Sequence, residues 1–292
     1  TLRFLGVRGT TGTEASFLEL FRGDSARVDE LNRRVAARMG FERLYAVTGQ
    51  TYPRKTDYAY LSTLAGIGTS ASKFANDLRL LQHLHELEEP FEAEQIGSSA
   101  MPYKRNPMRA ERMNGLARHI VTLSLDAAQT AAAQWLERTL DDSANRRIAI
   151  PEAYLATDAV LLVWHNVARG LVVRPAVIRR HLEQELPFLA TEAILVRAVR
   201  KGGDRQALHE RLRQHALAAA ERIKDRGEPN DLLERIVGDA AFGLSREEIA
   251  DMLDPARHVG RAPAQVTAFL DREVEPLLRR ERAAPTPPEL RA

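Results

Sequence analysis

The fold class follows from residues 56–90, which read TDYAYLSTLAGIGTSASKFANDLRLLQHLHELEEP. Its apolar residues recur at alternating spacings of three and four, the pattern of a helix that packs nearly parallel to its neighbours in a bundle. The apolar stripe consists of Leu64, Ile67, Ala71, Phe74, Leu78 and Leu81. Pro90 cannot continue a helix. We therefore predict a helix over about residues 56–89 and an all-α, long-helix bundle around it.

Two further helices of the same kind follow along the chain. The first should begin near Pro107 with Asn106 as its N-cap, and its apolar face contains Leu116, Ile120, Leu123 and Ala127. The second covers about residues 139–168. Thr139 and Asp142 have the spacing of a capping box, and Pro151 should kink or break the helix. Its predicted apolar face continues through Leu155, Ala159, Val163 and Val167.

The sequence predicts two domains of unequal helix length. Residues 1–172 form the bundle domain, which begins with an irregular segment (1–23), a short helix (25–39), a loop (46–55) and the long helices. It carries a long loop over residues 90–107. Residues 173–281 form a smaller helical domain, where Asp204 starts a helix after a glycine pair, Ser245 and Glu248 form a capping box, and a last helix spans 262–280. Residues 282–292 are predicted to be a disordered tail.

Composition limits the classes of function. The chain has 292 residues, 44% hydrophobic and 28% charged, which is enough for a sizeable core. Cysteine is absent, which excludes disulfides and thiolate metal sites and suits a reducing, cytoplasmic setting. No apolar run approaches the roughly 18 residues that span a bilayer, so we expect no membrane contact. The chain starts with Thr in the middle of a pattern, from which we expect a fragment or a processed form.

The placement of charge favours a small anionic ligand. A net charge of +2 does not suggest a nucleic-acid partner. The basic residues gather instead in two clusters, one of Lys104, Arg105, Arg109, Arg112 and Arg118, and one of Arg138, Arg146 and Arg147. The alternative is that both clusters are solvated helix faces.

The segment IGSSAMPYKRNP, residues 96–107, contains few apolar side chains that could be buried and several polar side chains that could take part in chemistry. Loops this long inside a bundle tend to be functional or disordered. A serine hydroxyl such as that of Ser98 needs a stabilised alkoxide before it can act as a base. Lys104 and the N–H groups at the following helix start could supply that stabilisation, or could hold a carboxylate. The loop contains no histidine, so nothing local supports a serine hydrolase. A serine-rich linker with a basic capping segment is the alternative.

GSSAMPYKRNP (97–107) resembles the signature loop of the fumarase/aspartase superfamily. Four other stretches of the chain are similar to sequences of one family in this superfamily, the adenylosuccinate lyases. They are GVRGTTGTEASF (6–17), TGQTYPRK (48–55), QWLERTLDDSANRR (134–147) and ELPFLATE (185–192). The resemblance covers nearly the whole chain apart from the tail. It implies a homotetramer with a core of long helices and active sites shared between subunits. It also implies a lyase that eliminates fumarate from adenylosuccinate, giving AMP, and from the succinyl-carboxamide imidazole ribotide of purine biosynthesis.

The resemblance also implies roles for individual residues. Ser98 would be the general base of the β-elimination, and Lys104 and Asn106 would bind the succinyl carboxylate and stabilise the charge that develops on it. Substrate-binding roles fall on Gln50 and on the residues that hold the nucleotide and its phosphate, which are Arg112, Arg138, Ser143 and Arg147. Arginine forks suit such a ligand because they grip phosphate and carboxylate with two hydrogen bonds. No metal and no cofactor are expected.

Some residues depart from the family pattern or stay open. The family's general acid is a histidine upstream of residue 1, and none of the eight histidines of this chain matches it, so we expect the fragment alone to be weak or inactive. Arg8 stands where the family usually has lysine. Thr10, Thr11 and Thr13 could line the pocket, and His209 could lie near the substrate. The alternatives to this lyase are another lyase of the superfamily and a non-catalytic helical assembly protein.

Overall fold

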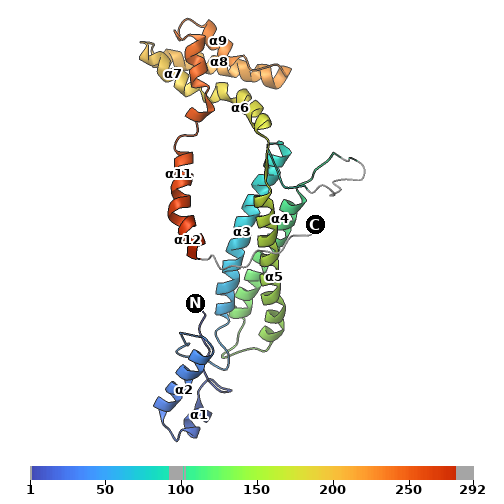
Figure 1. Ribbon diagram of the computed structural model, residues 1–292, viewed down its shortest axis with the longest axis vertical. Helices are drawn as coiled ribbons and strands as arrows, with labels where there is room; N and C mark the ends of the chain where they lie inside the picture. The colour runs from blue at the N-terminus through green and yellow to red at the C-terminus, as the bar shows by residue number, and fades with distance from the viewer. Residues whose placement is uncertain (1, 92–100, 102, 281–292) are drawn as a thin grey trace. The chain divides into compact units, whose positions relative to one another are not determined.

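The computed structural model describes residues 2–91, 101 and 103–280, and the chain separates into two compact units (Figure 1). The first extends to Val172 and the second begins at Val173. Both are built of α-helices, so the predicted all-α fold is confirmed. Strands β1 (Leu87–Glu88) and β2 (Val172–Val173) pair with each other. Ser98, most of the predicted loop over 90–107 and the predicted tail over 282–292 lie outside the described residues.

Three long helices form the bundle of the first unit: α3 (Lys55–His83), α4 (Met108–Ala132) and α5 (Asp141–Arg169) (Figure 1). Small residues line their closest faces. Ala65, Ala71 and Ala75 of α3 are buried, and a Cβ on Gly68 would lie 3.6 Å from the backbone of Ala117 in α4. The helices can approach closely because their contact residues are small, and the larger side chains fill the space beside them.

The predicted apolar stripes need correction at this level. The most buried face of α3 carries Leu61, Ala65, Gly68, Ala71, Ala75, Leu78 and Gln82. Of the predicted stripe only Ala71 and Leu78 are fully buried. The other stripe residues are partly buried beside that face: Leu64, Ile67, Phe74 and Leu81. On α5, Leu155 is 70% exposed, because the helix turns Ala153, Ala156 and Val160 toward its neighbours instead.

The predicted boundary between α3 and α4 is also wrong in its details. The predicted helix over 56–89 ends at His83, where the chain reverses through His85, a non-glycine residue with φ of 59°. Asn106 was expected to cap α4, but Pro107 holds the cap position and makes no side-chain cap bond. Glu89 accepts the free N–H groups of the first turn instead, because the reversal brings its carboxylate across the helix start.

Helix α5 begins and continues differently from the prediction. Leu140 occupies the cap position without a side-chain cap bond, so Thr139 and Asp142 do not form a capping box. The Asp142 carboxylate pairs with two arginines instead. Pro151 lies inside α5, which neither stops nor restarts there. Proline costs the helix one backbone hydrogen bond, and packing of the buried residues on both sides, Ala149 and Ala153, holds the helix together.

The N-terminal segment precedes the bundle. It was predicted to be irregular over 1–23, but it contains the short helix α1 (Ala15–Leu20). Helix α2 (Ser25–Arg38) is confirmed; Asp24 accepts the N–H of Arg27 at its start. The loop predicted over 46–55 is confirmed up to Arg54, after which α3 begins.

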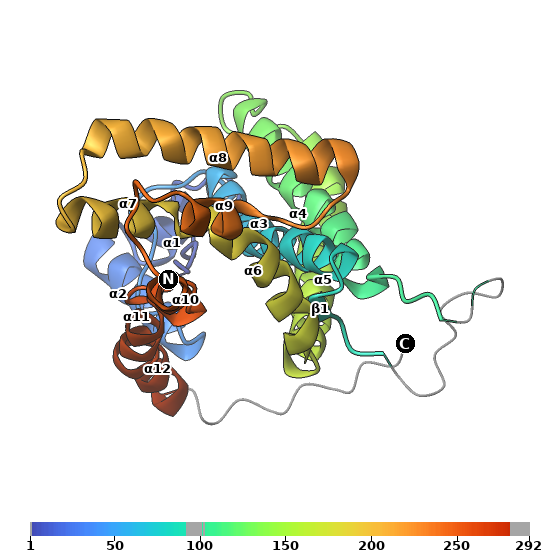
Figure 2. The ribbon, with the colours of Figure 1, turned by 90° about the horizontal axis from the view of Figure 1, so that it is seen from above.

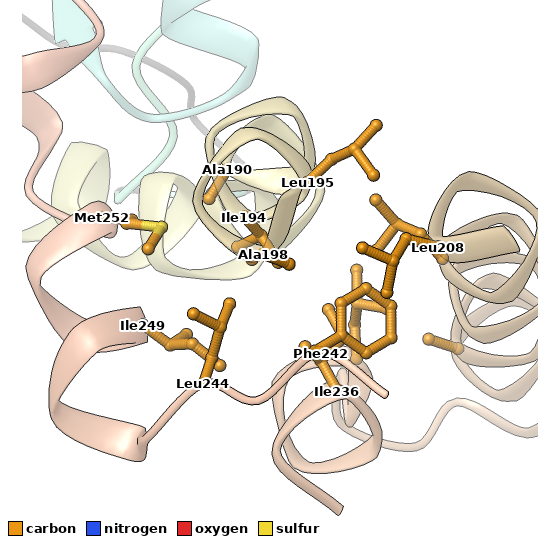
Figure 3. Close-up of a cluster of buried hydrophobic side chains, with 13 residues drawn as sticks. Ala190, Ile194, Leu195, Ala198, Leu208, Ile236, Phe242, Leu244, Ile249 and Met252 are labelled. Carbon is orange, nitrogen blue, oxygen red and sulfur yellow. The ribbon is translucent and has the colours of Figure 1, made fainter. Parts of the chain in front are cut away.

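The second unit packs its shorter helices around one apolar core. The elements are α6 (Pro175–Leu189), α7 (Thr191–Arg200), α8 (Arg205–Arg226), α9 (Leu232–Gly238), α10 (Arg246–Met252) and the 3₁₀ turn η1 (Pro255–Arg257). Helices α7, α8 and α9 lie side by side (Figure 2). Ile194, Leu208 and Phe242 point toward one another in the core (Figure 3). The predicted caps at Asp204 and Ser245 are both confirmed.

The last predicted helix, 262–280, is continuous but not uniform. It consists of α11 (Ala262–Phe269), the π-helical turn η2 (Leu270–Val274) and α12 (Glu275–Arg280). Its apolar residues, among them Val266, Phe269 and Leu277, are about half exposed.

Candidate functional site

An ion-pair cluster joins the starts of α3 and α5 at one end of the bundle. Asp142 has no exposed surface, and its two carboxylate oxygens accept hydrogen bonds from Arg54 (Nε, 2.5 Å) and from Arg138 (Nη2, 2.9 Å). Burial alone would raise the pKa of Asp142, but the two guanidinium groups outweigh burial and hold that pKa below its usual value. The carboxylate is therefore ionised and fixes both arginines in place.

A second layer of the cluster is built on Tyr52. Its hydroxyl donates to Asp57 Oδ1 (2.8 Å), and Arg146 donates to the other Asp57 oxygen (2.5 Å) and to the Tyr52 hydroxyl. The guanidinium groups of Arg54 and Arg146 lie 4.8 and 5.2 Å from the centre of the Tyr52 ring. Burial and the Asp57 carboxylate together raise the pKa of Tyr52, so its hydroxyl remains a donor at neutral pH. Arg146 thus has a structural role within the cluster.

Two loops meet beside this cluster. Glu137 accepts the backbone N–H of Gln50 (2.6 Å), and a Cβ on Gly49 would collide with the Glu137 side chain. Gly12 packs against the backbone of residues 48 and 49 closely enough to exclude any side chain. Leu136, next to Glu137, is exposed and has a φ of 50°. A bulky residue in the left-handed region stores strain, and such strain concentrates at functional sites.

Four of the predicted substrate-binding residues lie at this end of the bundle. Gln50 precedes α3, Arg138 precedes α5, and Ser143 and Arg147 belong to the first two turns of α5. A surface depression of about 280 Å³ is lined by Ser143, Arg146, Arg147, Ile150 and Pro151. Arg138 gives Nε and Nη2 to Asp142, which leaves Nη1 without a bond to any described residue. The arrangement offers guanidinium groups to an anion.

The other predicted residues lie at the opposite end. Lys104 and Asn106 precede α4, and Arg112 is in its second turn; all three are exposed. This end is next to the end of α3, because Gln82 donates to the carbonyl of Arg105 (3.2 Å). Helix α3 has 29 residues, and a rise of 1.5 Å per residue makes it about 40 Å long. Within one chain, Lys104 and Asn106 are therefore not brought together with Gln50, Arg138, Ser143 and Arg147. Arg112, predicted to hold the nucleotide, lies at the Lys104 end and not with the other predicted nucleotide-binding residues.

The residues that the sequence left open lie in three different surroundings. Arg8 is structural: it pairs with Glu14 (3.0 Å) and donates to the backbone carbonyls of Leu5 and Ala46 (3.2 Å each). Thr11 and Thr13 are joined by a hydrogen bond in the loop of Gly12, close to Gly49. His209 lies on α8 in the second unit and lines a hollow there with Arg205 and Arg213.

Sequence reasoning missed the residues that support the site, above all Arg54, Asp57 and Asp142. The spacing of the two aspartates along the buried stripes of α3 and α5 could have indicated their role. Asp57 lies four residues before Leu61 on the buried stripe of α3, and Asp142 lies seven before Ala149 on that of α5. A charged residue that continues a buried stripe indicates a buried ion pair, because an unpaired charge there would be too costly.

Within the described ranges, no group of three or more histidine, aspartate or glutamate side chains could hold a metal ion. Among the same residues, no helix combines the length and the apolar character needed to cross a membrane.

Comparison with known proteins identifies the relatives of the chain. The family model described as adenylosuccinate lyase C-terminus matches residues 187–269, and the model described as lyase matches residues 23–122. The adenylosuccinate lyases of Saccharomyces cerevisiae and Schizosaccharomyces pombe are 52% identical over 269 residues and 50% identical over 275 residues. These alignments cover 92% and 94% of this chain but 56% and 57% of the yeast proteins. The chain therefore spans little more than half the length of the curated relatives it matches.

Solved structures share the fold. The 3-carboxy-cis,cis-muconate lactonizing enzyme from Pseudomonas putida superposes with a TM-score of 0.72 at 23% identity, over 92% of this chain and 56% of that one. The fumarate lyase from Mesorhizobium sp. BNC1 superposes with the same TM-score at 20% identity, over 94% of this chain and 57% of that one. Likeness at this identity shows the fold alone. The curated relatives, by contrast, confirm the resemblance to adenylosuccinate lyases that the sequence motifs indicated.

Proposed function

Because this chain resembles adenylosuccinate lyases over nine tenths of its length, we propose that the full-length protein that carries it is a C–N lyase of purine biosynthesis. It cleaves adenylosuccinate to AMP and fumarate, and the succinyl-carboxamide imidazole ribotide to its product and fumarate. The observation that carries the proposal is the 52% identity to a relative named adenylosuccinate lyase. The match to the family's C-terminal model over residues 187–269 supports it.

In this proposal one end of the bundle removes the proton and binds the succinyl carboxylate, and the other end binds the nucleotide. Ser98 removes the proton next to a succinyl carboxylate, and Lys104 and Asn106 hold that carboxylate as negative charge develops on it. The C–N bond then breaks as an acid from elsewhere in the full-length protein protonates the leaving nitrogen. At the other end, Arg138, Ser143 and Arg147 grip the phosphate of the nucleotide, and Gln50 contacts the substrate. The ion pair of Arg138 with Asp142 supports this role because it fixes the guanidinium before a ligand arrives.

A site that needs both ends of a bundle about 40 Å long must draw them from different subunits. A homotetramer with shared active sites meets that need. Exposed apolar side chains support the assembly: Trp135, Leu136 and Leu140 precede α5 near Arg138 in the sequence, and Ile148 and Leu155 are exposed on α5. Large apolar residues grouped on a surface are typical of contacts between subunits.

The proposed substrates are small anionic metabolites, and we place the enzyme in the cytoplasm. A chain with no cysteine suits a reducing compartment. No cofactor is invoked, because the acid, the base and the anion-binding groups are all protein side chains.

A spectroscopic assay tests the function directly. The full-length protein is mixed with adenylosuccinate, and the ultraviolet change on cleavage is followed. The expected result is turnover that Ser98→Ala lowers by about 10²–10⁴-fold, the usual contribution of a general base. Ser70→Ala, which removes an exposed hydroxyl of α3 bonded only to a backbone carbonyl, is the matched control. No turnover, or turnover that Ser98→Ala leaves unchanged, would sink the proposal.

A phosphate-free substrate separates the proposal from another lyase of the same superfamily. If Arg138→Ala abolished activity but removing the phosphate from the substrate did not matter, the enzyme would act on a different succinyl amine.

A further inference from the structure

Two buried side chains fasten together the two chain segments that lead into and out of the predicted loop. Glu89 is 4% exposed and Gln82 is 6% exposed. The Glu89 carboxylate accepts the N–H of Arg109 on both oxygens (3.0 and 3.1 Å) and the N–H of Ala110 (3.0 Å). Residue 89 is thereby held to the first turn of α4, twenty residues further along the chain.

Gln82 makes a second connection between the same segments. Its side-chain oxygen accepts the N–H of Glu89 (3.2 Å), and its side-chain nitrogen donates to the carbonyl of Arg105 (3.2 Å). One buried amide thus holds the backbone at positions 89 and 105 at the same time. The bond to Glu89 is buried and the bond to Arg105 is partly buried. Losing the first leaves a backbone N–H that water cannot easily satisfy.

Outer contacts complete this arrangement. Arg109 donates to the carbonyl of Pro90 (2.6 Å), Arg105 pairs with Glu88 (3.5 Å), and the Arg105 guanidinium lies 4.8 Å from the centre of the Phe91 ring. Every one of these contacts joins a residue of 88–91 to a residue of 105–110. We call the buried part, Gln82 and Glu89, the latch.

The latch contacts the backbone of Arg105, which stands between two residues with a proposed role. Lys104 and Asn106 flank Arg105, whose carbonyl Gln82 holds. Both side chains are exposed, so the backbone beneath them sets where they point. The backbone of this segment is tied further by a bond from the N–H of Lys104 to the carbonyl of Met101 (2.9 Å) and by one from the N–H of Met108 to that of Asn106 (2.9 Å).

We infer that Gln82 and Glu89 are positioning residues for carboxylate recognition: they fix the backbone of residues 104–106, so that Lys104 and Asn106 meet the succinyl carboxylate in one geometry. The inference rests on the proposed function for the identity of the ligand, but the latch itself is defined by the described contacts. Neither residue touches substrate. Each acts through the backbone that carries the binding groups, and a small displacement of such groups is enough to weaken binding.

The sharpest test changes Gln82, because Gln82→Met keeps the volume and removes both polar bonds while leaving Glu89 to cap α4. Ser72→Ala is the matched control: Ser72 donates to Asn114 (2.7 Å), so the control also removes one bond between α3 and α4, but away from the latch. Fumarate and AMP are the probes, measured separately by calorimetry on the full-length protein. Fumarate reports on the carboxylate-binding end, and AMP reports on the nucleotide-binding end.

Gln82→Met should weaken fumarate binding roughly five- to tenfold, the effect expected from losing one or two buried hydrogen bonds, with AMP binding unchanged. Ser72→Ala should change neither. Amide hydrogen exchange adds a readout that needs no ligand: Gln82→Met should speed exchange of the N–H groups of residues 104–110, and Ser72→Ala should not.

Two results would overturn the inference: unchanged fumarate affinity together with unchanged exchange at 104–110, or equal weakening of fumarate and AMP. Failure of the proposed function looks different, because the unmodified protein would then cleave no adenylosuccinate and bind no fumarate. In that case exchange decides alone: faster exchange at 104–110 in Gln82→Met supports the latch, and unchanged exchange overturns it.

Discussion

The two ends of the bundle each bury one carboxylate, and they stabilise it in opposite ways. At the end near the start of α4, neutral backbone N–H groups surround Glu89. At the end near the start of α5, two guanidinium groups surround Asp142. Burial raises the pKa of Glu89 despite the N–H donors, whereas the arginines hold the pKa of Asp142 low despite its burial.

The surroundings of the two carboxylates indicate different structural roles. Backbone N–H groups offer direction but no full charge, so Glu89 fixes geometry while its own charge remains costly. Guanidinium groups offer charge as well, so Asp142 remains ionised and holds Arg54 and Arg138 in position. Glu89 joins its own segment to the first turn of α4, and Asp142 holds two arginines in place.

The largest expected effect comes from breaking the Asp142 end. Asp142→Asn leaves Arg54 buried without a counter-charge, and removing one partner of a buried pair costs about 3–5 kcal/mol. Urea unfolding followed by circular dichroism measures the loss. Asp77→Asn is the control, since Asp77 forms an exposed pair with Lys73 and should change the free energy of unfolding by less than about 0.5 kcal/mol. Equal effects of the two variants on the free energy of unfolding would contradict the stabilising role of the buried Asp142 ion pairs.

Breaking the Glu89 end should cost less. Glu89→Ala leaves the buried N–H groups of Arg109 and Ala110 without an acceptor, at about 1–3 kcal/mol. Glu89→Gln should cost less than Glu89→Ala, because the amide oxygen still accepts from one of them. The comparison cap is Ser245, which belongs to a regular capping box in the second unit; Ser245→Ala should cost about 1 kcal/mol. A Glu89→Ala variant as stable as the unmodified chain would contradict the capping role.

The sequence predicted the bundle because spacings of three and four depend only on helix geometry, and α3, α4 and α5 keep that spacing throughout. It did not predict the end of α3 or the cap of α4, because Glu89 meets α4 only after the chain reverses at His85. Local rules favoured Asn106 as the cap, but a tertiary contact from twenty residues earlier replaced it. The same cause explains Asp142, which has capping-box spacing but turns toward Arg54.

The nucleotide-binding role of Arg138, Ser143 and Arg147 stays a prediction, and the motifs did not predict the contacts that hold these residues. The three lie at one end of the bundle, whereas Arg112 lies at the other. The supporting contacts join α3 to α5, nearly ninety residues apart, and no local pattern contains such a contact. That Lys104 and Asn106 lie at the opposite end was equally out of reach, because it depends on the direction of α4 relative to α3.

Acid should act on the two ends with opposite sign. The pKa of Asp142 is lowered in the folded chain, so its contribution is present above the unfolded value of about 4 and is lost as pH falls through the folded value. The pKa of Glu89 is raised, so the folded chain favours its protonated form, and stability falls as pH rises from about 4.3 through the folded value.

Urea midpoints measured from pH 3 to pH 7 test these signs. Relative to the unmodified chain, the destabilisation by Asp142→Asn should shrink toward acid pH, because both chains then lack the carboxylate. The destabilisation by Glu89→Gln should shrink toward neutral pH, because only the unmodified chain pays for a buried charge there. If both differences moved in the same direction, the contrast between the two ends would be wrong.

Substitution of Arg147 should change stability least. Its effect should appear instead in ligand binding, which differs between the two ends of the bundle. Arg147 is exposed and forms no ion pair with a described residue, so Arg147→Met should change the free energy of unfolding by less than about 0.5 kcal/mol. In the full-length protein the same variant should weaken AMP binding about tenfold or more, the effect of losing a charge-assisted hydrogen bond to phosphate, and leave fumarate binding unchanged. Arg118→Met, on the exposed face of α4, is the control for lost positive charge. Calorimetry with the two ligands tests this. If Arg147→Met weakened fumarate binding and left AMP binding unchanged, the proposed placement of the two anions at the ends of the bundle would be wrong.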